Sequence, residues 1–281
     1  MPFASLEGRQ LHYTDTGGDQ PALIFLHAYT TNGSLWDGMI ARFAPMFRCI
    51  APDLPGHGRS EPSDLPKGIG SLAEDIVRLL DHMQIERAHV CGLSIGGMIG
   101  QHLGFDYATR MRSLVLACTS AAIPSAAQIV WEERLEVLRT KGLWAEVGET
   151  VERWYGAGLL ESFGPADLDP IGRMIASTSL AGALTCGEAV KQHDTRSRLG
   201  DILAPTLVIG GDLDQSFAPE HAKALADGIS GAKLVMIPGA GHLAPVQQPD
   251  AFDAAMRAFF EGQTWQGAGR TATAQQVTIE G

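Results

Sequence analysis

The chain contains 281 residues, of which 45% are hydrophobic and 19% are charged, and its formal net charge at pH 7 is −11. An acidic surface does not attract nucleic acid or anionic membranes, so we expect neither as a partner. No stretch approaches the roughly 18 apolar residues of a membrane-spanning helix, and the opening segment MPFASLEGRQ lacks a long apolar core. The sequence therefore predicts a soluble, cytoplasmic protein.

The four cysteines are scattered and form no C-x-x-C pair; they are Cys49, Cys91, Cys118 and Cys186. Three of them lie in apolar, strand-like runs, which indicates buried thiols in a reducing compartment. No cluster of His, Cys, Asp and Glu has the spacing of metal ligands, so we expect no metal. The segment GLSIGG is similar to a nucleotide-binding loop but lacks its lysine, so we expect no nucleotide cofactor.

Strand-like runs alternate with helical patterns through the first part of the chain. The predicted strands are 10–15, 22–27, 47–51, 88–93 and 112–117. The predicted helices are 35–43, 71–82 and 95–105. In the second of these helices, Ser71 is the predicted N-cap and Glu74 stands at the capping-box position.

The same alternation resumes toward the C-terminal end. The predicted strands there are 205–211 and 232–237, and the predicted helices are 219–227 and 249–260. Strands that alternate with helices form a parallel or mostly parallel sheet with helices on both faces. The fold class is therefore α/β.

Between residues 121 and 198 the alternation stops and helical patterns follow one another. The predicted helices are 126–139, 144–154, 170–177 and 181–193. Insertions after a strand of such a sheet lie over its carboxyl edge, where ligands bind, so we expect a helical cap. The alternative, that this segment only thickens the core, stays open.

The domain organisation follows from this insertion. We expect a core of residues 1–120 and 199–262, a cap of 121–198, and a polar, disordered tail at 263–281. The cap segment holds three of the five tryptophans, Trp131, Trp144 and Trp154, which are therefore candidates for contact with a substrate.

Ser94 lies between Gly92 and Gly96 in a G-x-S-x-G pattern, with an apolar strand before it and a helical pattern after it. A serine on a tight strand-to-helix turn has a strained backbone, and side chains two residues away on either side would collide. Such a turn lifts the hydroxyl above the sheet and points it at the N-terminus of the next helix. Ser94 is therefore the candidate nucleophile.

A serine nucleophile needs a base, and the base needs an acid that orients it. Asp214 and His242 each follow a predicted strand, in the segments GGDLDQSFAP and PGAGHLAP. The order Ser94, Asp214, His242 is the one expected for this type of sheet. We prefer Asp214 to Asp212, because Asp212 is closer to the strand end and is better placed to cap the turn.

Two backbone N–H groups are the predicted donors to an oxyanion. One belongs to Ile95, directly after the nucleophile, and the other to Tyr29, with Ala28 as the alternative. The phenol of Tyr29 either contacts the substrate or only packs. Among the other histidines, we expect His27 to organise the oxyanion loop.

Two further histidines have weaker interpretations. His57 lies in a turn and is interpreted as structural. His193, next to Asp194 at the end of the cap, is a candidate for contact with a substrate carboxylate or carbonyl.

Together these residues resemble the α/β-hydrolase superfamily. The matching segments are LHAYTTNGSLW, PDLPGHGRS, GLSIGGMIGQ, GGDLDQSFAPEHA and IPGAGHLAPVQQPDAF. The segments GLSIGGMIGQHLG, LVLACTSAA and AGALTCGEAV are similar to 3-oxoadipate enol-lactonases and related small esterases. The resemblance implies a sheet of about eight strands, a helical cap inserted after the sixth, no cofactor, and a triad of Ser94, Asp214 and His242.

The chain departs from the lactonase pattern in two places. The oxyanion loop reads His27-Ala28-Tyr29-Thr30, whereas the lactonases usually carry an Asn-Ser-Leu-Gly-like segment, and Ala28 replaces the usual superfamily glycine. The turn DLPGHG has the general esterase form instead of the arginine-containing lactonase form. These differences leave the fold and the triad intact and leave the substrate open.

The leading hypothesis is a cofactor-independent serine hydrolase that cleaves a small-molecule carboxylic ester or lactone through an acyl-enzyme. Two alternatives keep the triad and change the reaction to carbon–carbon bond hydrolysis or perhydrolysis. A third alternative is a non-catalytic ligand-binding protein with this fold. The sequence leaves open whether the chain forms a homo-oligomer.

Overall fold

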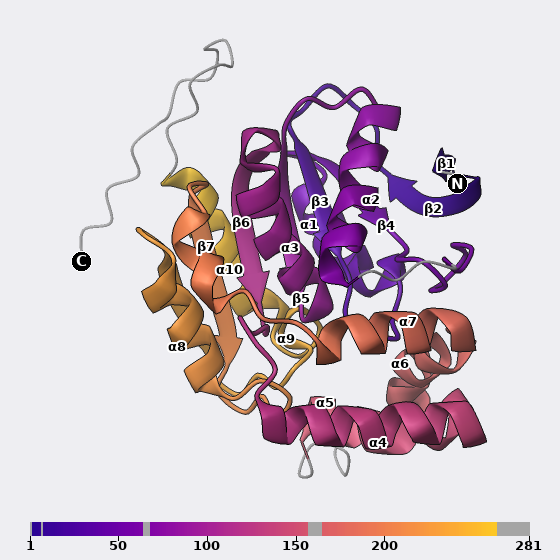
Figure 1. The fold of residues 1–281 in the computed structure, drawn as a ribbon. Helices are drawn as coiled ribbons and strands as arrows, with labels where there is room; N and C mark the ends of the chain where they lie inside the picture. The colour runs from indigo at the N-terminus through magenta and orange to yellow at the C-terminus, as the bar shows by residue number, and fades with distance from the viewer. Residues whose placement is uncertain (1, 7, 64–67, 157–164, 263–281) are drawn as a thin grey trace.

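The computed structural model describes residues 2–6, 8–63, 68–156 and 165–262, without the side chains of residues 165–169. In these ranges the chain forms one eight-stranded sheet with helices packed around it (Figure 1). The predicted tail, 263–281, lies outside the described residues. No helix in the described part of the chain has both the length and the apolar character needed to cross a membrane.

The sheet is mostly parallel, as predicted. Its strands are β1 (Phe3–Leu6), β2 (Arg9–Asp15), β3 (Ala22–Leu26), β4 (Arg48–Pro52), β5 (Ala88–Leu93), β6 (Met111–Ala117), β7 (Thr206–Gly211) and β8 (Lys233–Ile237). Their spatial order is β1-β2-β4-β3-β5-β6-β7-β8. The pairs β1–β2 and β2–β4 are antiparallel, and the other neighbouring pairs are parallel. Strand β1 is absent from the predicted elements, because its four residues are too few to establish a pattern.

Helices cover both faces of this sheet (Figure 1). The α-helices of the core are α1 (Asp37–Phe43), α2 (Ile69–His82), α3 (Ile95–Asp106), α8 (Pro219–Gly228), α9 (Ala244–Gln247) and α10 (Pro249–Glu261). Short 3₁₀ helices are η1 (Gly33–Trp36), η2 (Ala108–Arg110), η3 (Leu143–Ala145) and η4 (Arg196–Asp201).

Successive side chains of the central strands enter two separate cores. Ile24 of β3 and Val90 of β5 belong to the core that also contains residues of α2, α3 and α8. Leu23 and Cys91, one residue away in each strand, belong to the core that contains residues of α1 and α10. Because successive residues of a strand point to opposite faces and both faces are buried, these strands are continuous apolar runs in the sequence.

The start of α2 corrects one prediction. The helix begins at Ile69, and its N-cap is Gly68, whose φ is 87°. Ser71 lies within the first turn and donates a hydrogen bond to the Gly68 carbonyl at 2.9 Å, while Glu74 accepts one from Arg78 at 2.7 Å. The predicted capping box is therefore wrong. The helix starts earlier because Ile69 is buried in the core and a glycine supplies the turn before it.

Between β6 and β7 the described residues form helices and one isolated β-bridge, between Ala122 and Asp194. The α-helices of this insertion are α4 (Ser125–Lys141), α5 (Val147–Tyr155), α6 (Pro165–Ser177) and α7 (Leu180–Lys191). Figure 1 shows them grouped at the end of the sheet toward which the arrows of β6 and β7 point. The insertion thus follows the sixth strand, as the resemblance implies.

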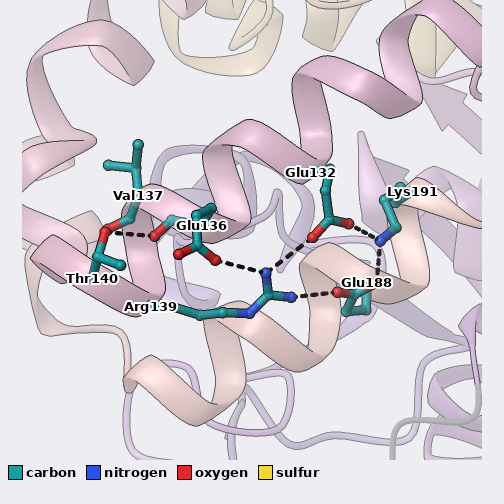
Figure 2. Close-up of polar contacts among 7 residues, drawn as sticks. All are labelled: Glu132, Glu136, Val137, Arg139, Thr140, Glu188 and Lys191. Carbon is teal, nitrogen blue, oxygen red and sulfur yellow. Dashed lines mark hydrogen bonds and ion pairs between the residues drawn. The ribbon is translucent and has the colours of Figure 1, made fainter.

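Helices α4 and α7 are joined on their outer side by a network of charged side chains (Figure 2). Arg139 of α4 contacts Glu132 at 3.0 Å, Glu136 at 3.4 Å and Glu188 of α7 at 2.7 Å. Lys191 of α7 bridges the same Glu132 and Glu188. This network links the two helices away from the cavity described below.

Candidate active site

Ser94 occupies the turn between β5 and α3, with φ 58° and ψ −116°. A positive φ is rare for a residue with a side chain and costs of the order of 1–3 kcal/mol, so neighbouring contacts must hold the turn. The N–H of Ser94 donates to the Ala117 carbonyl at 2.9 Å, and the Thr119 hydroxyl donates to the Ser94 carbonyl at 2.7 Å. Both partners lie at the end of β6, which therefore fixes the strained turn.

The two glycines of the motif are required by close backbone approach. A Cβ atom on Gly92 would lie 2.1 Å from the Gly96 carbonyl oxygen. A Cβ atom on Gly96 would lie 2.3 Å from the Leu26 carbonyl oxygen of β3. No side chain fits at either position, in agreement with the sequence prediction for this turn.

His242 and Asp214 form a buried pair on the loops after β8 and β7. The His242 Nδ1 atom lies 3.2 Å from Asp214 Oδ1 and 3.0 Å from Oδ2. Oδ1 also accepts hydrogen bonds from the backbone N–H groups of Ser216, at 2.8 Å, and Phe217, at 3.0 Å. The two side chains are 2% and 0% exposed. The carboxylate is thus held by its own loop and directed at the imidazole.

Asp212, the less favoured acid, has a different environment. Its Oδ1 atom accepts a hydrogen bond from the Gly239 N–H at 2.7 Å, and its side chain is exposed. The bond joins the loops that follow β7 and β8. Asp212 therefore ties the two loops together, in the capping role that its position in the sequence suggests.

The predicted oxyanion donors lie on the loops after β3 and β5. Tyr29 is 5% exposed and Ile95 is 0% exposed. No described residue accepts a hydrogen bond from the backbone N–H of either one. Buried backbone N–H groups are nearly always paired, so two unpaired ones mark a place where an acceptor can bind.

His27 and His57 hold the loop that carries Tyr29. The Nε2 atom of His27 accepts from the Leu54 N–H at 2.9 Å, and that of His57 accepts from the Thr30 N–H at 3.2 Å. Burial lowers the pKa of both imidazoles, that of His57 to about 3, so both are neutral. These contacts are structural, as the sequence analysis expects.

A cavity of about 260 Å³ opens between the carboxyl end of the sheet and the insertion. Ser94 and His242 both line it. Three of the predicted substrate contacts line it as well: Tyr29, Trp131 and Trp154. The Trp154 ring lies 5.9 Å from the His242 ring, and the Trp154 carbonyl accepts a hydrogen bond from the His242 backbone N–H at 3.0 Å. The insertion therefore reaches the predicted catalytic residues directly.

The phenol of Tyr29 is held by the insertion. It donates a hydrogen bond to the Ala183 carbonyl of α7 at 2.8 Å, and its ring packs edge-on against Trp131 at 5.2 Å. Burial raises the pKa of this phenol well above its usual value, so it stays protonated.

Two predicted substrate contacts lie outside the cavity lining. Trp144 is 75% exposed and lies on the surface of the insertion. His193 is 3% exposed, and its Nε2 atom lies 3.2 Å from the Ser120 carbonyl oxygen. The predicted helix 181–193 ends at Lys191 in the structure, so His193 lies beyond it, and Trp144 lies in η3 before α5 begins.

Two arginines of the insertion, Arg134 of α4 and Arg153 of α5, also line the cavity and are absent from the predicted set. Arg134 lies over the Trp131 ring at 4.4 Å and bonds Glu146 at 3.1 Å. Arg153 donates to the Thr150 hydroxyl at 3.1 Å, and no carboxylate among the described residues pairs with it. The i,i+3 spacing of Trp131 and Arg134, which puts both on one helix face, is the sequence signal that could have indicated Arg134.

The charge of Arg153 is only partly compensated. Its pKa is lowered to about 10, first by burial and next by the positive charge of Arg134, while Glu146 and Glu149 oppose the shift. The guanidinium remains cationic at neutral pH. A half-buried cation beside a second cation is a favourable place for an anion.

Comparison with known proteins agrees with this architecture. The model of the alpha/beta hydrolase family matches residues 23–255. The 3-oxoadipate enol-lactonase 2 of Acinetobacter baylyi is 34% identical over 249 residues, which cover 88% of this chain and 92% of the relative. An enol-lactonase structure from Burkholderia xenovorans is 32% identical with a TM-score of 0.88, covering 92% of this chain and 100% of that one. A hydrolase structure from Pseudomonas aeruginosa is 34% identical with a TM-score of 0.87, covering 92% and 97%. The chain therefore belongs to the α/β-hydrolase family.

Proposed function

We propose that this protein is a serine hydrolase that cleaves a carboxylic ester or lactone through an acyl-enzyme. The observation that carries the proposal is the buried pair of His242 and Asp214 beside a cavity that Ser94 also lines. The similar proteins named as enol-lactonases support ester or lactone hydrolysis as the reaction. We also propose that residues 121–198 act as the cap, since helices α4 and α5 supply much of the cavity wall.

In the proposed mechanism, the Ser94 hydroxyl attacks the carbonyl carbon of the substrate while His242 Nε2 takes its proton. Asp214 holds the other ring nitrogen, Nδ1, in its protonated form and stabilises the imidazolium. His242 then gives the proton to the departing alkoxide. Water activated by the same imidazole attacks the acyl-enzyme and releases the acid and Ser94.

The negative charge of the tetrahedral intermediate needs two donors. The unpaired N–H groups of Tyr29 and Ile95 are suited to this role, and that of Ile95 lies at the N-terminus of α3, where the helix dipole favours negative charge. In the free enzyme the same groups would bind water, and in the substrate complex they would bind the carbonyl oxygen before Ser94 attacks.

Covalent labelling tests the nucleophile directly. Incubation with a fluorescent p-nitrophenyl alkylphosphonate should attach one label per chain at Ser94. Ester turnover should be lost at the same rate as the label is attached. Peptide mass spectrometry identifies the labelled residue. Labelling at another residue, or full inhibition without a bond to Ser94, would contradict the proposal.

The cavity also favours a substrate that places an anionic group near Arg153, on the side of the cavity formed by the insertion. Arg153 presents a positive charge there without an ion-pair partner in the described part of the chain, in a protein whose net charge is −11. A carboxylate on the substrate would pair with this guanidinium while the ester or lactone carbonyl lies at Ser94. We therefore propose an ester or lactone that carries a carboxylate.

Replacing Arg153 with glutamine should remove this preference. We expect kcat/KM for mono-p-nitrophenyl glutarate to fall about 10- to 100-fold, because a charge-assisted hydrogen bond is worth about 1.5–3 kcal/mol. With the neutral methyl p-nitrophenyl glutarate, kcat/KM should stay within about twofold. Both constants come from release of p-nitrophenol.

Arg139→Gln is the matched control for this test. It removes the same charge from the outer surface of the insertion (Figure 2), and it should leave the ratio of the two constants unchanged. An equal loss on both glutarate esters in Arg153→Gln would mean that Arg153 supports the structure and does not bind the anion.

A further inference from the structure

A second histidine lines the cavity and has no part in the proposed mechanism. His221 lies in the first turn of α8, and its ring packs against Phe217 with centroids 5.5 Å apart. The Phe217 ring lies 5.7 Å from the ring of His242 as well. Phe217 therefore contacts both imidazoles, and His221 is a close neighbour of the proposed base within the same cavity.

The Nδ1 atom of His221 is engaged by Ser120, a buried residue just after β6. Ser120 Oγ lies 2.7 Å from His221 Nδ1 and 2.7 Å from the Ala122 carbonyl oxygen. The same oxygen accepts from the Ala122 N–H at 3.2 Å. The hydroxyl thus has three polar neighbours and a single proton to give.

Counting protons assigns the tautomer of His221. A carbonyl oxygen has no proton, so the 2.7 Å contact between Ser120 Oγ and Ala122 is attractive only if the hydroxyl donates to that carbonyl. Ser120 Oγ must then accept from His221, whose Nδ1 therefore carries the proton. Burial is the main cause that lowers the pKa of His221, against the charges of Asp214 and Glu220. The ring is neutral, and its Nε2 atom has a free lone pair.

The frame around Ser120 keeps this arrangement in place. The Ser120 carbonyl accepts from the Gln101 amide at 3.0 Å and lies 3.2 Å from His193 Nε2. Ala122 is bridged to Asp194 at the far end of the insertion. The backbone of Ser120, whose hydroxyl contacts His221, is therefore held by α3 and by the far end of the segment 121–198.

The Nε2 atom of His221 differs from those of the two structural histidines. In His27 and His57 the Nε2 atom is also unprotonated, but each accepts a hydrogen bond from a backbone N–H group. Among the described residues, none donates to His221 Nε2. An unpaired acceptor on a ring that lines a cavity is suited to bind a donor on a ligand.

We propose that His221 Nε2 accepts a hydrogen bond from a hydroxyl or N–H group of the substrate and selects substrates that carry one. This inference rests on the proposed hydrolase function and specifies its substrate further. A group that lacks a hydrogen to donate would leave this acceptor desolvated and unpaired, which is the usual basis for rejecting such an analogue.

Paired substrates test the selection. The hydroxylated substrates are p-nitrophenyl 2-hydroxybutanoate and p-nitrophenyl 3-hydroxybutanoate, and the reference is p-nitrophenyl butanoate. For the wild type, kcat/KM should be about tenfold higher with at least one of the hydroxylated esters than with the reference. In His221→Phe, which keeps a ring against Phe217 and lacks the acceptor, this preference should disappear. The test is the ratio of the kcat/KM values for the hydroxylated and the plain ester within each variant, so it does not depend on the absolute activity of His221→Phe. His221→Gln, whose amide oxygen can reach the position of Nε2, should restore part of the preference.

Nitrogen NMR tests the tautomer without a substrate. In ¹⁵N-histidine-labelled protein, the His221 signals, assigned by their loss in His221→Phe, should show a protonated Nδ1 and an unprotonated Nε2. A protonated Nε2 would overturn the inference, and so would equal discrimination by the wild type and His221→Phe. If the wild type hydrolyses neither the butanoate esters nor mono-p-nitrophenyl glutarate, the proposed hydrolase function fails, and the NMR spectrum still decides the tautomer.

Discussion

Replacing Ser94 with alanine is expected to lower kcat for ester hydrolysis by about 10⁴- to 10⁶-fold and to leave the fold unchanged. The substitution removes the only atom that forms the bond to the acyl group. Alanine keeps the same backbone restrictions as serine, and the loss of one oxygen beside the cavity disturbs no core packing. Turnover of mono-p-nitrophenyl glutarate measures the activity, and circular dichroism with thermal unfolding measures the fold.

Ser177→Ala is the matched control, since Ser177 is an exposed serine in α6 that donates only to the Met174 carbonyl. It should retain wild-type kcat. A Ser94→Ala variant that keeps more than about a tenth of the wild-type kcat would contradict the acyl-enzyme mechanism. Retained ligand binding with no turnover in the wild type would instead favour the binding-protein alternative.

Replacing Asp214 with asparagine should lower kcat by about 10⁴-fold, the size of the effect at the equivalent position of a serine protease triad. The backbone N–H groups of Ser216 and Phe217 both donate to Oδ1, so they require an oxygen there. The asparagine amide nitrogen must then take the place of Oδ2 and face His242. It can only donate, so Nδ1 becomes the acceptor and the proton moves to Nε2. An imidazole in that tautomer cannot take the proton of Ser94.

Asp212→Asn provides the matched control for this prediction. Asp212 lies two residues away, is exposed, and accepts one backbone N–H at the Gly239 turn, which an asparagine oxygen can also accept. We expect its kcat to stay within about twofold of the wild type. Equal losses in the two variants would indicate that the loop after β7 is sensitive to any substitution and would refute the specific role of Asp214.

The residues proposed as the triad could be predicted because each follows a strand of a parallel sheet. Carboxyl ends of neighbouring parallel strands lie at one edge, so residues just beyond β5, β7 and β8 converge there whatever the details of packing. The glycines beside Ser94 were equally accessible to sequence reasoning, because they reflect a local backbone requirement. Local chemistry and chain order are visible in a sequence.

The cavity wall was less predictable because it depends on how the helices of the insertion are rotated. Trp131 and Trp154 face the cavity and Trp144 faces solvent, although all three have the same chemistry. Arg153 is a candidate because it lacks an ion-pair partner among the described residues. His221 is a candidate because Ser120, about 100 residues earlier in the chain, contacts its ring. Such relations arise only from tertiary packing, and no periodicity in one sequence encodes them.

The start of α2 shows the same limit at smaller scale. A serine followed by a glutamate three residues later is typical of a helix start, but the burial of Ile69 extends the helix by two residues. Here a tertiary contact outweighs a local preference. The same explanation applies to β1, whose four residues are stabilised as a strand by pairing with β2.

The strained turn at Ser94 has a consequence for any attempt to evolve this protein for robustness. Its φ of 58° and ψ of −116° suit glycine better than serine. A screen that rewards only resistance to heat would therefore favour glycine in place of the proposed nucleophile. Selection for a longer-lived protein has to be coupled to a readout of turnover, or it will enrich folded and inactive variants.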